Sequence, residues 1–298
     1  MITNKLNLPQ PFVEAARNDH AYTPKRYSVT SVLKGTTEAV LQRRHAEEIV
    51  TDVADSVWAI FGSAVHSILE RSTETPSQIK EGYLTYDHPS GYTLSGVFDL
   101  YDAETETVTD YKTASVWKAV KNDWDDYRRQ LLLYCLILRH NGFNASHGQI
   151  VALLKDHSKS KARHDRTYPQ HPVVVVSFDF AEDDFERAEH FLDVKFTEIE
   201  IAERMDDECL LPCSLRERWA TPRKFAVMKK GRKSAVRLYD TQKEAEERAD
   251  KEGAGFYVEL REGEDRKCQD YCSVSKWCTY WQFKTLESQK KNAPDLLK

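Results

Sequence analysis

Two carboxylates and an ammonium group interrupt a stretch that otherwise has the pattern of a β-hairpin, SGVFDLYDAETETVTDYKTAS at residues 95–115. The charged residues are Asp99, Asp110 and Lys112, and their neighbours include the apolar and β-branched residues that strands favour. Because side chains alternate along a strand, Asp110 and Lys112 point to the same face. A turn centred at residues 104 and 105 places Asp99 opposite Asp110.

A divalent cation between the two carboxylates is the chemistry that this arrangement predicts. Like charges directly opposite each other on paired strands destabilise a hairpin by up to about 1 kcal/mol, and a bound metal reverses that sign. Mg²⁺ and Mn²⁺ prefer carboxylate oxygens and keep positions open for water and phosphate. Beside such a metal, Lys112 can orient an activated water and offset charge on a phosphate. The plainer interpretation is an edge strand whose charges are solvated.

Two apolar segments, one on each side of the hairpin, carry polar residues spaced by four. His66 and Glu70 in GSAVHSILE share a helix face, beside small residues that allow close approach to the strands. Gln130 and Tyr134 form the polar stripe of the otherwise apolar segment QLLLYCLIL. Each residue alone is more simply explained as part of a core or a cap. Their combination with the hairpin favours one shared site.

The elements that would position these residues follow an α/β pattern. Helices are predicted within residues 28–45, with Ser28 or Thr30 as the cap, and within 55–72. The remaining predictions are strands over 81–88, 92–102 and 106–113, a helix over 124–142, strands over 147–156 and 172–180, and a helix over 181–205. We therefore predict a central mixed sheet flanked by helices, forming one domain over residues 1–205.

Residues 206–298 are predicted to form a second segment with a small inserted unit. The stretch at residues 224–260 has the pattern strand, turn, strand, helix, strand. Thr241 starts the helix as its cap, and Gly253 ends it. Cys213 precedes this β-β-α-β unit and Cys268 follows it, so the unit resembles an insertion held at both ends.

The cysteines are concentrated in this second segment. Cys135 lies in the apolar helix and is explained as a small buried hydrophobe. The other five are Cys209, Cys213, Cys268, Cys272 and Cys278. In a reducing compartment such a group is more often a metal site than a disulfide framework. Four thiolates fit either a 4Fe-4S cluster or a tetrahedral Zn²⁺ ion.

The charge distribution is more informative than the net charge of −5. Residues 221–240 contain seven Lys and Arg residues and one Asp, and residues 155–171 form a second basic stretch. A single charged run is usually a solvated face. Two runs flanking a candidate site favour contact with a phosphate backbone. The predicted contacts in the first run are Lys229, Lys230, Arg232 and Lys233.

The motifs GSAVHSILE, GVFDLYD, DYKT and QLLLY, in this order, resemble the RecB-family branch of the PD-(D/E)XK nuclease superfamily. The resemblance implies a restriction-endonuclease-like core. It implies that the catalytic Mg²⁺ or Mn²⁺ is held by side chains and one backbone carbonyl, namely His66, Asp99, Asp110 and the carbonyl of Tyr111. It also implies that Lys112 positions the water and that Gln130 and Tyr134 contact the DNA backbone.

The cysteine spacing resembles the iron–sulfur staple of AddB-like and CRISPR-adaptation nucleases, with two departures. Three residues separate Cys268 from Cys272, where that family usually has two, and no cysteine precedes Cys135. The fourth ligand must therefore be Cys213 or Cys209. We favour Cys213, because PCSLRERW followed by RKCQDYCSVSKWC is similar to the tail of phage-type members of the family.

The predicted function is a Mg²⁺- or Mn²⁺-dependent deoxyribonuclease, an exonuclease or end-processing enzyme of phage or bacterial recombination or replication. Its substrate would be DNA in the bacterial cytoplasm, with recombination or replication proteins as partners. No membrane span, signal peptide or phosphate-binding loop of a helicase motor is expected from the sequence. Two alternatives stay open. One is a catalytically inactive DNA-binding module with a structural metal site, and the other is a structural zinc protein with incidental hairpin charges.

Overall fold

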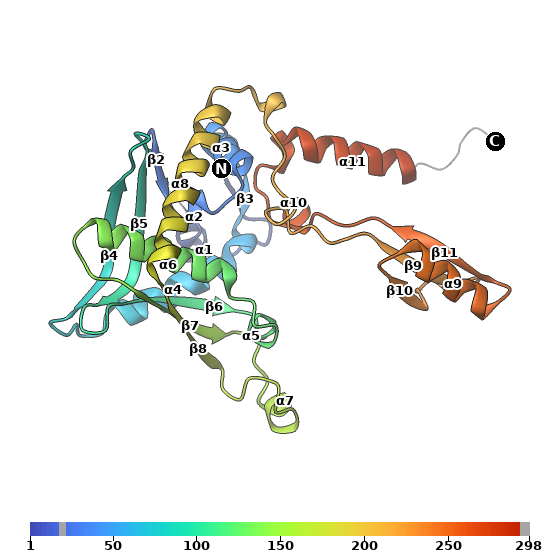
Figure 1. Ribbon diagram of the computed structural model, residues 1–298, viewed down its shortest axis with the longest axis horizontal. Helices are drawn as coiled ribbons and strands as arrows, with labels where there is room; N and C mark the ends of the chain where they lie inside the picture. Colours follow the sequence, from blue (N-terminus) through green and yellow to red (C-terminus); the bar gives the residue numbers. More distant parts are fainter. Residues whose placement is uncertain (18–21, 293–298) are drawn as a thin grey trace. The chain divides into compact units, whose positions relative to one another are not determined.

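The computed structural model describes residues 1–17 and 22–292, and these fall into two compact units, Met1–Met205 and Asp206–Lys298. The first unit contains a six-stranded sheet (Figure 1). Its strands are β2 (Arg26–Ser28), β4 (Gln78–Asp87), β5 (Thr93–Asp102), β6 (Thr107–Ala114), β7 (His147–Leu154) and β8 (Val173–Asp179). Its longer helices are α3 (Thr36–Arg44), α4 (Val57–Glu70), α6 (Asp125–His140) and α8 (Glu182–Glu203). Shorter elements are β1 (Ile2–Thr3), β3 (Thr51–Asp52), α1 (Gln10–Ala15), α2 (Val29–Val32), α5 (Val116–Val120) and α7 (Lys159–His164).

The sheet is mixed, as predicted. Its strand order is β2-β5-β6-β7-β8, with β4 paired to the other edge of β5. The pairs β4–β5, β5–β6 and β7–β8 are antiparallel, whereas β2–β5 and β6–β7 are parallel. Among the residues that the structure describes, no helix is both long and apolar enough to cross a membrane.

Helices α6 and α4 lie on opposite faces of this sheet. A Cβ atom built on Gly96 would lie 2.8 Å from the Tyr134 ring, so the glycine allows α6 to pack directly on β5. On α4, Gly62 approaches Thr113 of β6 with only 3.7 Å between its Cβ position and the threonine hydroxyl. Since side chains alternate along β6, Lys112 faces α6 and Thr113 faces α4. Both helices therefore flank the strand that carries the DYKT motif.

The two strands of the charged hairpin diverge at its aspartates. The pairing of β5 with β6 runs from Asp102↔Thr107 to Leu100↔Thr109, which matches the turn position predicted from the sequence. The ladder ends there, and residues 93–95 of β5 pair with β2 instead. Because β4 covers the other edge of β5 throughout, β2 and β6 share one edge. Asp99 and Asp110 lie at the fork between them.

One predicted helical segment is divided in two. Residues 28–45 form α2 and α3, separated at residues 33–35, where Gly35 adopts an extended ψ of 141°. The predicted cap is confirmed at Ser28, whose hydroxyl accepts a hydrogen bond of 3.1 Å from the Ser31 backbone N–H. Sequence periodicity continued across residues 33–35, so it did not reveal this break.

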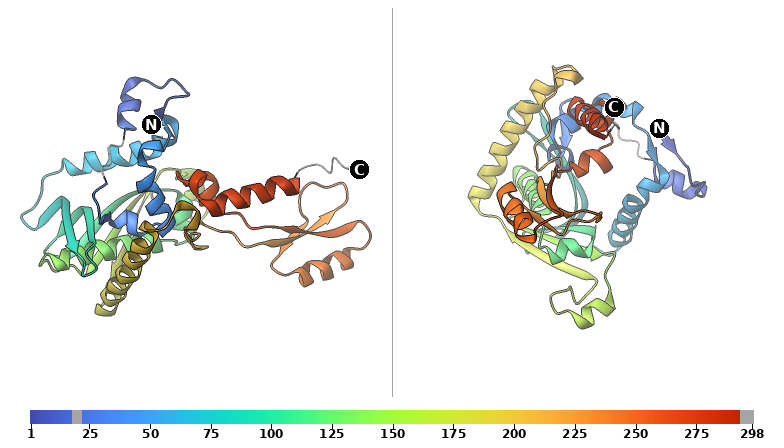
Figure 2. Two further views of the ribbon diagram at one scale, coloured as in Figure 1. Left: turned by 90° about the horizontal axis from the view of Figure 1, so that it is seen from above. Right: turned by 90° about the vertical axis from the view of Figure 1, so that its right-hand side faces the viewer.

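The second unit contains the β-β-α-β element in the predicted order. Its strands β9 (Lys224–Lys229), β10 (Arg237–Tyr239) and β11 (Phe256–Arg261) form an antiparallel sheet of order β10-β9-β11. Helix α9 (Gln242–Glu252) packs along one face of it (Figure 2). The buried core is small, with Val227, Ala245 and Ala249 at its centre. Helices α10 (Arg266–Asp270) and α11 (Thr279–Asn292) follow.

Candidate metal centre

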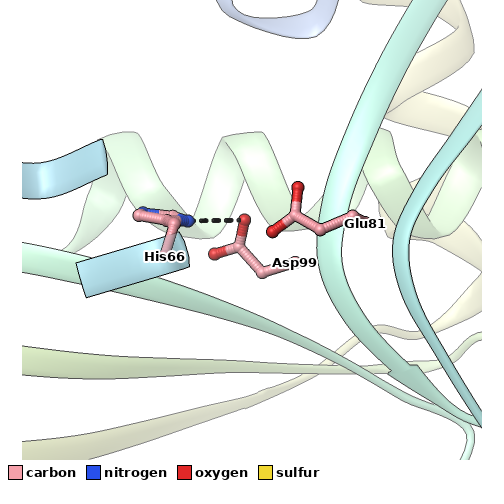
Figure 3. A group of neighbouring side chains, drawn as sticks. All are labelled: His66, Glu81 and Asp99. Carbon is pink, nitrogen blue, oxygen red and sulfur yellow. Dashed lines mark hydrogen bonds and ion pairs between the residues drawn. The ribbon is translucent and has the colours of Figure 1, made fainter. Parts of the chain in front are cut away.

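Three side chains from different elements converge at the fork between β5 and β6. His66 of α4, Glu81 of β4 and Asp99 of β5 offer ligand atoms that all lie within 4.8 Å of one another (Figure 3). His66 Nδ1 lies 3.1 Å from Asp99 Oδ1. This hydrogen bond raises the pKa of the imidazole, against the lowering effect of burial. The predicted ligands His66 and Asp99 are therefore brought together.

Glu81 was missed by the sequence interpretation. Its neighbours pair as Lys80↔Leu100 and Gly82↔Phe98, so Glu81 lies opposite Asp99 but outside the ladder. Its φ of +46° is in the left-handed region, which is unfavourable for a residue with a side chain. Burial raises the pKa of its carboxyl, and the charge of Asp99 adds to this shift. Strained backbone beneath a partly buried charge is typical of functional sites.

Asp110 and Lys112 extend the site from the neighbouring strand. Asp110 is 3% exposed, and Lys112 Nζ lies 2.6 Å from its Oδ2. Burial raises the pKa of Asp110 to about 6, although the Lys112 ammonium opposes that shift. Apart from this ion pair, Oδ2 has no partner among the described residues. A buried carboxylate oxygen left in this state is unusual in proteins and suits an additional ligand.

The residues at the fork fit a hard divalent cation. Glu81 and Asp99 belong to the group of mutually close ligand atoms. Asp110 lies outside that group, but it is near enough for the charge of Asp99 to raise its pKa, and Lys112 supplies one positive charge beside it. A bound Mg²⁺ or Mn²⁺ would offset this excess of negative charge and would find the oxygen ligands it prefers. Asp99 Oδ2 also accepts a 2.6 Å hydrogen bond from the Tyr111 backbone N–H. The role of the Tyr111 carbonyl stays a prediction.

Gln130 of α6 lies next to Asp110, and Tyr134 lies next to Gln130. Gln130 Nε2 donates a 2.9 Å hydrogen bond to the Tyr134 hydroxyl and lies 3.5 Å from Asp110 Oδ1. Tyr134 is only 6% exposed, and its ring packs over Gly96. The predicted polar stripe of α6 therefore faces Asp110. Its contact with a DNA backbone stays a prediction.

Three other cysteines of the second unit lie close enough to Cys268 to influence the pKa of its thiol. Cys268 is buried, and burial raises the pKa of its thiol to about 12. Negative charge on Cys272, Cys213 and Cys278 adds to that shift, as does Asp265. Cys209 is exposed and is not among the main causes of the pKa shift of Cys268. Within the described part of the chain, however, no three of these sulfur atoms lie mutually within 4.8 Å.

The predicted basic residues are exposed at the turn between β9 and β10. Gly231, with a φ of +81°, makes the turn possible. The exposed basic side chains are Lys229, Lys230, Arg232 and Lys233. None of them belongs to an ion pair among the described residues. Their charge is therefore available to an external anion.

Comparisons with solved structures show only remote likeness. A protein described as SSO0001 has 14% identity and a TM-score of 0.46, covering 62% of this chain and 83% of that one. An alkaline exonuclease from Laribacter hongkongensis has 12% identity and a TM-score of 0.34, covering 60% and 92%. A phage related exonuclease from Haemophilus somnus 129PT has 12% identity and a TM-score of 0.29, covering 58% and 75%.

The sequence comparison is more decisive. No curated protein matches the sequence significantly. Residues 76–279, about two thirds of the chain, match the family described as the PD-(D/E)XK nuclease superfamily. The match includes Asp99, Asp110 and Lys112, and it ends one residue after Cys278. The chain therefore belongs to the PD-(D/E)XK nuclease superfamily.

Proposed function

We propose that this protein is a Mg²⁺- or Mn²⁺-dependent deoxyribonuclease of the RecB-like branch, acting as an exonuclease or end-processing enzyme. The observation that carries the proposal is the fork between β5 and β6. There Asp110 keeps a buried oxygen without a hydrogen-bond partner, 2.6 Å from the Lys112 ammonium. Membership of the nuclease superfamily supports the same conclusion.

In this proposal the residues at the fork hold the metal and prepare the phosphate for attack by water. The ion, when bound, would lower the pKa of a coordinated water and stabilise charge on the phosphate. Its ligands would be His66, Glu81, Asp99 and Asp110. Lys112, held in place by its ion pair with Asp110, would orient the attacking water and offset negative charge that develops on the phosphate. Gln130 would fix the orientation of the Asp110 carboxylate through the hydrogen bond that its Nε2 donates to Asp110 Oδ1.

DNA is the proposed substrate, and the exposed basic turn is the proposed backbone contact. Lys229, Lys230, Arg232 and Lys233 present four positive charges close together in the sequence. Such a group contributes to affinity by releasing counterions from DNA, without reading its sequence. A role in phage or bacterial recombination or replication is part of the proposal.

We also propose that Cys213, Cys268, Cys272 and Cys278 ligate one structural centre, as in the iron–sulfur nucleases. The effect of Cys272, Cys213 and Cys278 on the pKa of the Cys268 thiol supports this assignment. A 4Fe-4S cluster is proposed, with a tetrahedral Zn²⁺ ion as the alternative, because four thiolates fit either centre.

The decisive experiment is incubation of the protein with linear and circular, single- and double-stranded DNA, with and without Mg²⁺ or Mn²⁺. Wild type should cleave only with metal. Asp110→Ala and Lys112→Ala should each reduce the rate at least about a hundredfold, because each removes a group from the charge-stabilising site. Glu104→Ala, an exposed acid in the turn of the same hairpin, is the matched control and should cleave normally.

Circular dichroism of each variant would show whether the fold is retained. Wild-type rates in folded Asp110→Ala or Lys112→Ala would contradict the assignment of these residues. DNA binding without cleavage by wild type, in every metal tested, would favour the inactive DNA-binding module instead.

A further inference from the structure

Two tryptophans of the first unit are exposed. Trp58 lies on the helix that carries His66, and Trp117 follows the strand that carries Lys112. Trp58 of α4 is 60% exposed and Trp117 of α5 is 53% exposed. Helix α4 has the apolar sequence VWAIFGSAVHSILE, yet none of its residues is buried. Large apolar side chains gathered on a surface usually mark a place where something binds.

Both rings lie at the same end of the parallel pair β6–β7. These strands end at the paired residues Ala114 and Leu154, and α5 and α7 follow them (Figure 1). Lys155, the first residue after β7, places its Nζ 3.9 Å from the centre of the Trp58 ring. Lys161 of α7 places its Nζ 5.8 Å from the centre of the Trp117 ring. Each exposed ring therefore has a lysine beside it. We call Trp58, Trp117, Lys155 and Lys161 the tryptophan–lysine edge.

This edge is joined to the metal centre through α4. Trp58, Gly62 and His66 are spaced by four and so lie along one side of the helix. Gly62 is the point at which α4 packs against Thr113, the residue after Lys112. Trp58 and His66 are about 12 Å apart along the helix axis, at 1.5 Å per residue. That length corresponds to about three or four nucleotides at 3.4 Å per nucleotide.

The surrounding charge favours a nucleic acid over an apolar partner. Residues 155–166 contain five Lys and Arg residues and two Asp. Asp156 accepts hydrogen bonds from the Ser115 hydroxyl and the Val116 backbone N–H, and Asp165 accepts from Thr167. Both acids are thus engaged in local hydrogen bonds, while Lys155 and Lys161 are exposed.

Aromatic rings beside cations suit single-stranded DNA in particular. Every base has a flat face that can stack on a tryptophan, and its phosphates pair with lysines. Bases within a duplex already stack on one another and offer no free face. We propose that the tryptophan–lysine edge binds unpaired nucleotides of the strand whose phosphate reaches the metal centre. This inference rests on the proposed nuclease function and adds that the substrate is unpaired next to the cut.

The test is a binding measurement on the full chain without divalent metal, so that no cleavage occurs. The probes are a labelled single-stranded oligothymidine, an abasic strand of the same length, and a blunt duplex. Trp58→Leu keeps an apolar side chain but removes the aromatic face, and it should weaken oligothymidine binding roughly five- to hundredfold. Binding of the abasic strand should change less than twofold. Trp58→Phe, which keeps a ring, should restore most of the affinity.

Phe283→Leu is the matched control, because Phe283 of α11 is 65% exposed and lies outside the edge. It should bind all three probes as wild type does. Trp117→Leu should repeat the Trp58→Leu pattern, and the unfolding temperature of each variant checks the fold. Unchanged oligothymidine binding in both tryptophan variants would overturn the inference. That result is the one expected if the rings bind another protein instead of DNA. An equal loss for the abasic strand would also overturn it.

Cleavage assays separate this inference from the proposed function. Trp58-dependent binding by a protein that never cleaves DNA would support the inference while removing the nuclease proposal. Cleavage from duplex ends at wild-type rates in both tryptophan variants, with unchanged strand binding, would overturn the inference and leave the nuclease proposal intact.

Discussion

Asp110 in the first unit and Asp265 in the second are equally buried, each 3% exposed, but their surroundings differ. Asp110 Oδ2 lies 2.6 Å from the Lys112 ammonium and has no hydrogen-bond partner among the described residues. Asp265 Oδ2 accepts from the Tyr280 hydroxyl at 2.8 Å and from Lys284 Nζ at 2.6 Å. It also accepts from Arg218 at 3.1 Å.

If the proposed function holds, the difference separates a carboxylate used for chemistry from one used for structure. A fully satisfied buried charge holds its neighbours in place, whereas an unsatisfied one costs free energy unless a ligand completes it. The first unit can sustain that cost because its hydrophobic core extends continuously over the sheet, α6 and α8. The second unit has a small core around Val227, Ala245 and Ala249, and needs other sources of stability.

The largest expected effect follows from this difference in cores. Serine at Cys213, Cys268, Cys272 or Cys278 should remove the proposed cysteine-ligated centre and unfold much of the second unit. Structural metal sites contribute on the order of 10 kcal/mol to the free energy of folding. The first unit should stay folded. Hydrogen exchange would locate the loss, and metal and sulfide analysis of anaerobically purified protein would identify the centre.

Cys209→Ser is the matched control, because Cys209 is exposed and lies close in sequence to Cys213. It should keep both the metal and the fold. If the second unit of Cys268→Ser stays protected from hydrogen exchange, its protein contacts alone are sufficient to keep it folded. The second unit would then not need a metal to offset its small hydrophobic core.

The same substitution should change the free energy of unfolding much more at Asp265 than at Asp110. Asp265→Asn leaves Arg218 and Lys284 without their anion and should lower the free energy of unfolding of the second unit by about 3 kcal/mol. Asp110→Asn removes a buried charge whose Oδ2 lacks a hydrogen-bond partner, and its ion-pair partner Lys112 is partly exposed, so the free energy of unfolding should stay within about 1 kcal/mol of wild type. Cleavage should nevertheless be lost.

Urea denaturation of both variants, in buffer without divalent metal, measures this contrast. Equal destabilisation by the two substitutions would mean that Asp110 is as structural as Asp265. The cleavage rate of Asp265→Asn, measured where the first unit is folded, would show whether the second unit contributes to activity.

Much of the hairpin could be predicted from the sequence, because its turn fixes its register. A centre at residues 104 and 105 gives the observed pairing of Leu100 with Thr109. The divergence of the strands beyond that pair could not be predicted, since it depends on β2 occupying the same edge of β5. The proximity of Cys213 to Cys268 was equally invisible to local patterns and came only from the family resemblance.

Glu81 could have been found from the sequence but was not. The predicted turn at residues 89–91 already sets a register in which residue 81 faces Asp99. The alternation of side chains along the strand did not mark Glu81 as a metal ligand, because a charged residue on a strand is usually solvated. Its left-handed backbone depends on tertiary contacts and has no sequence signal.

The smallest expected effect concerns this strained residue, and it tests whether the first unit gives up stability for its site. Glycine adopts a φ of +46° without steric cost, so Glu81→Gly should raise the free energy of unfolding by about 0.5–1 kcal/mol relative to Glu81→Gln. Both variants lose one carboxylate from the group formed by His66, Glu81 and Asp99. They should therefore bind Mn²⁺ roughly tenfold more weakly, which is the size of effect typical of supporting residues in metal sites. Titration calorimetry measures the Mn²⁺ affinity, and urea denaturation measures the free energy of unfolding.

Glu106→Gly is the control, because Glu106 has a φ of +52° in the hairpin turn and lies outside the group formed by His66, Glu81 and Asp99. It should leave Mn²⁺ affinity unchanged. Wild-type Mn²⁺ affinity in Glu81→Gln would remove Glu81 from the ligand set and leave its strained backbone without a functional explanation.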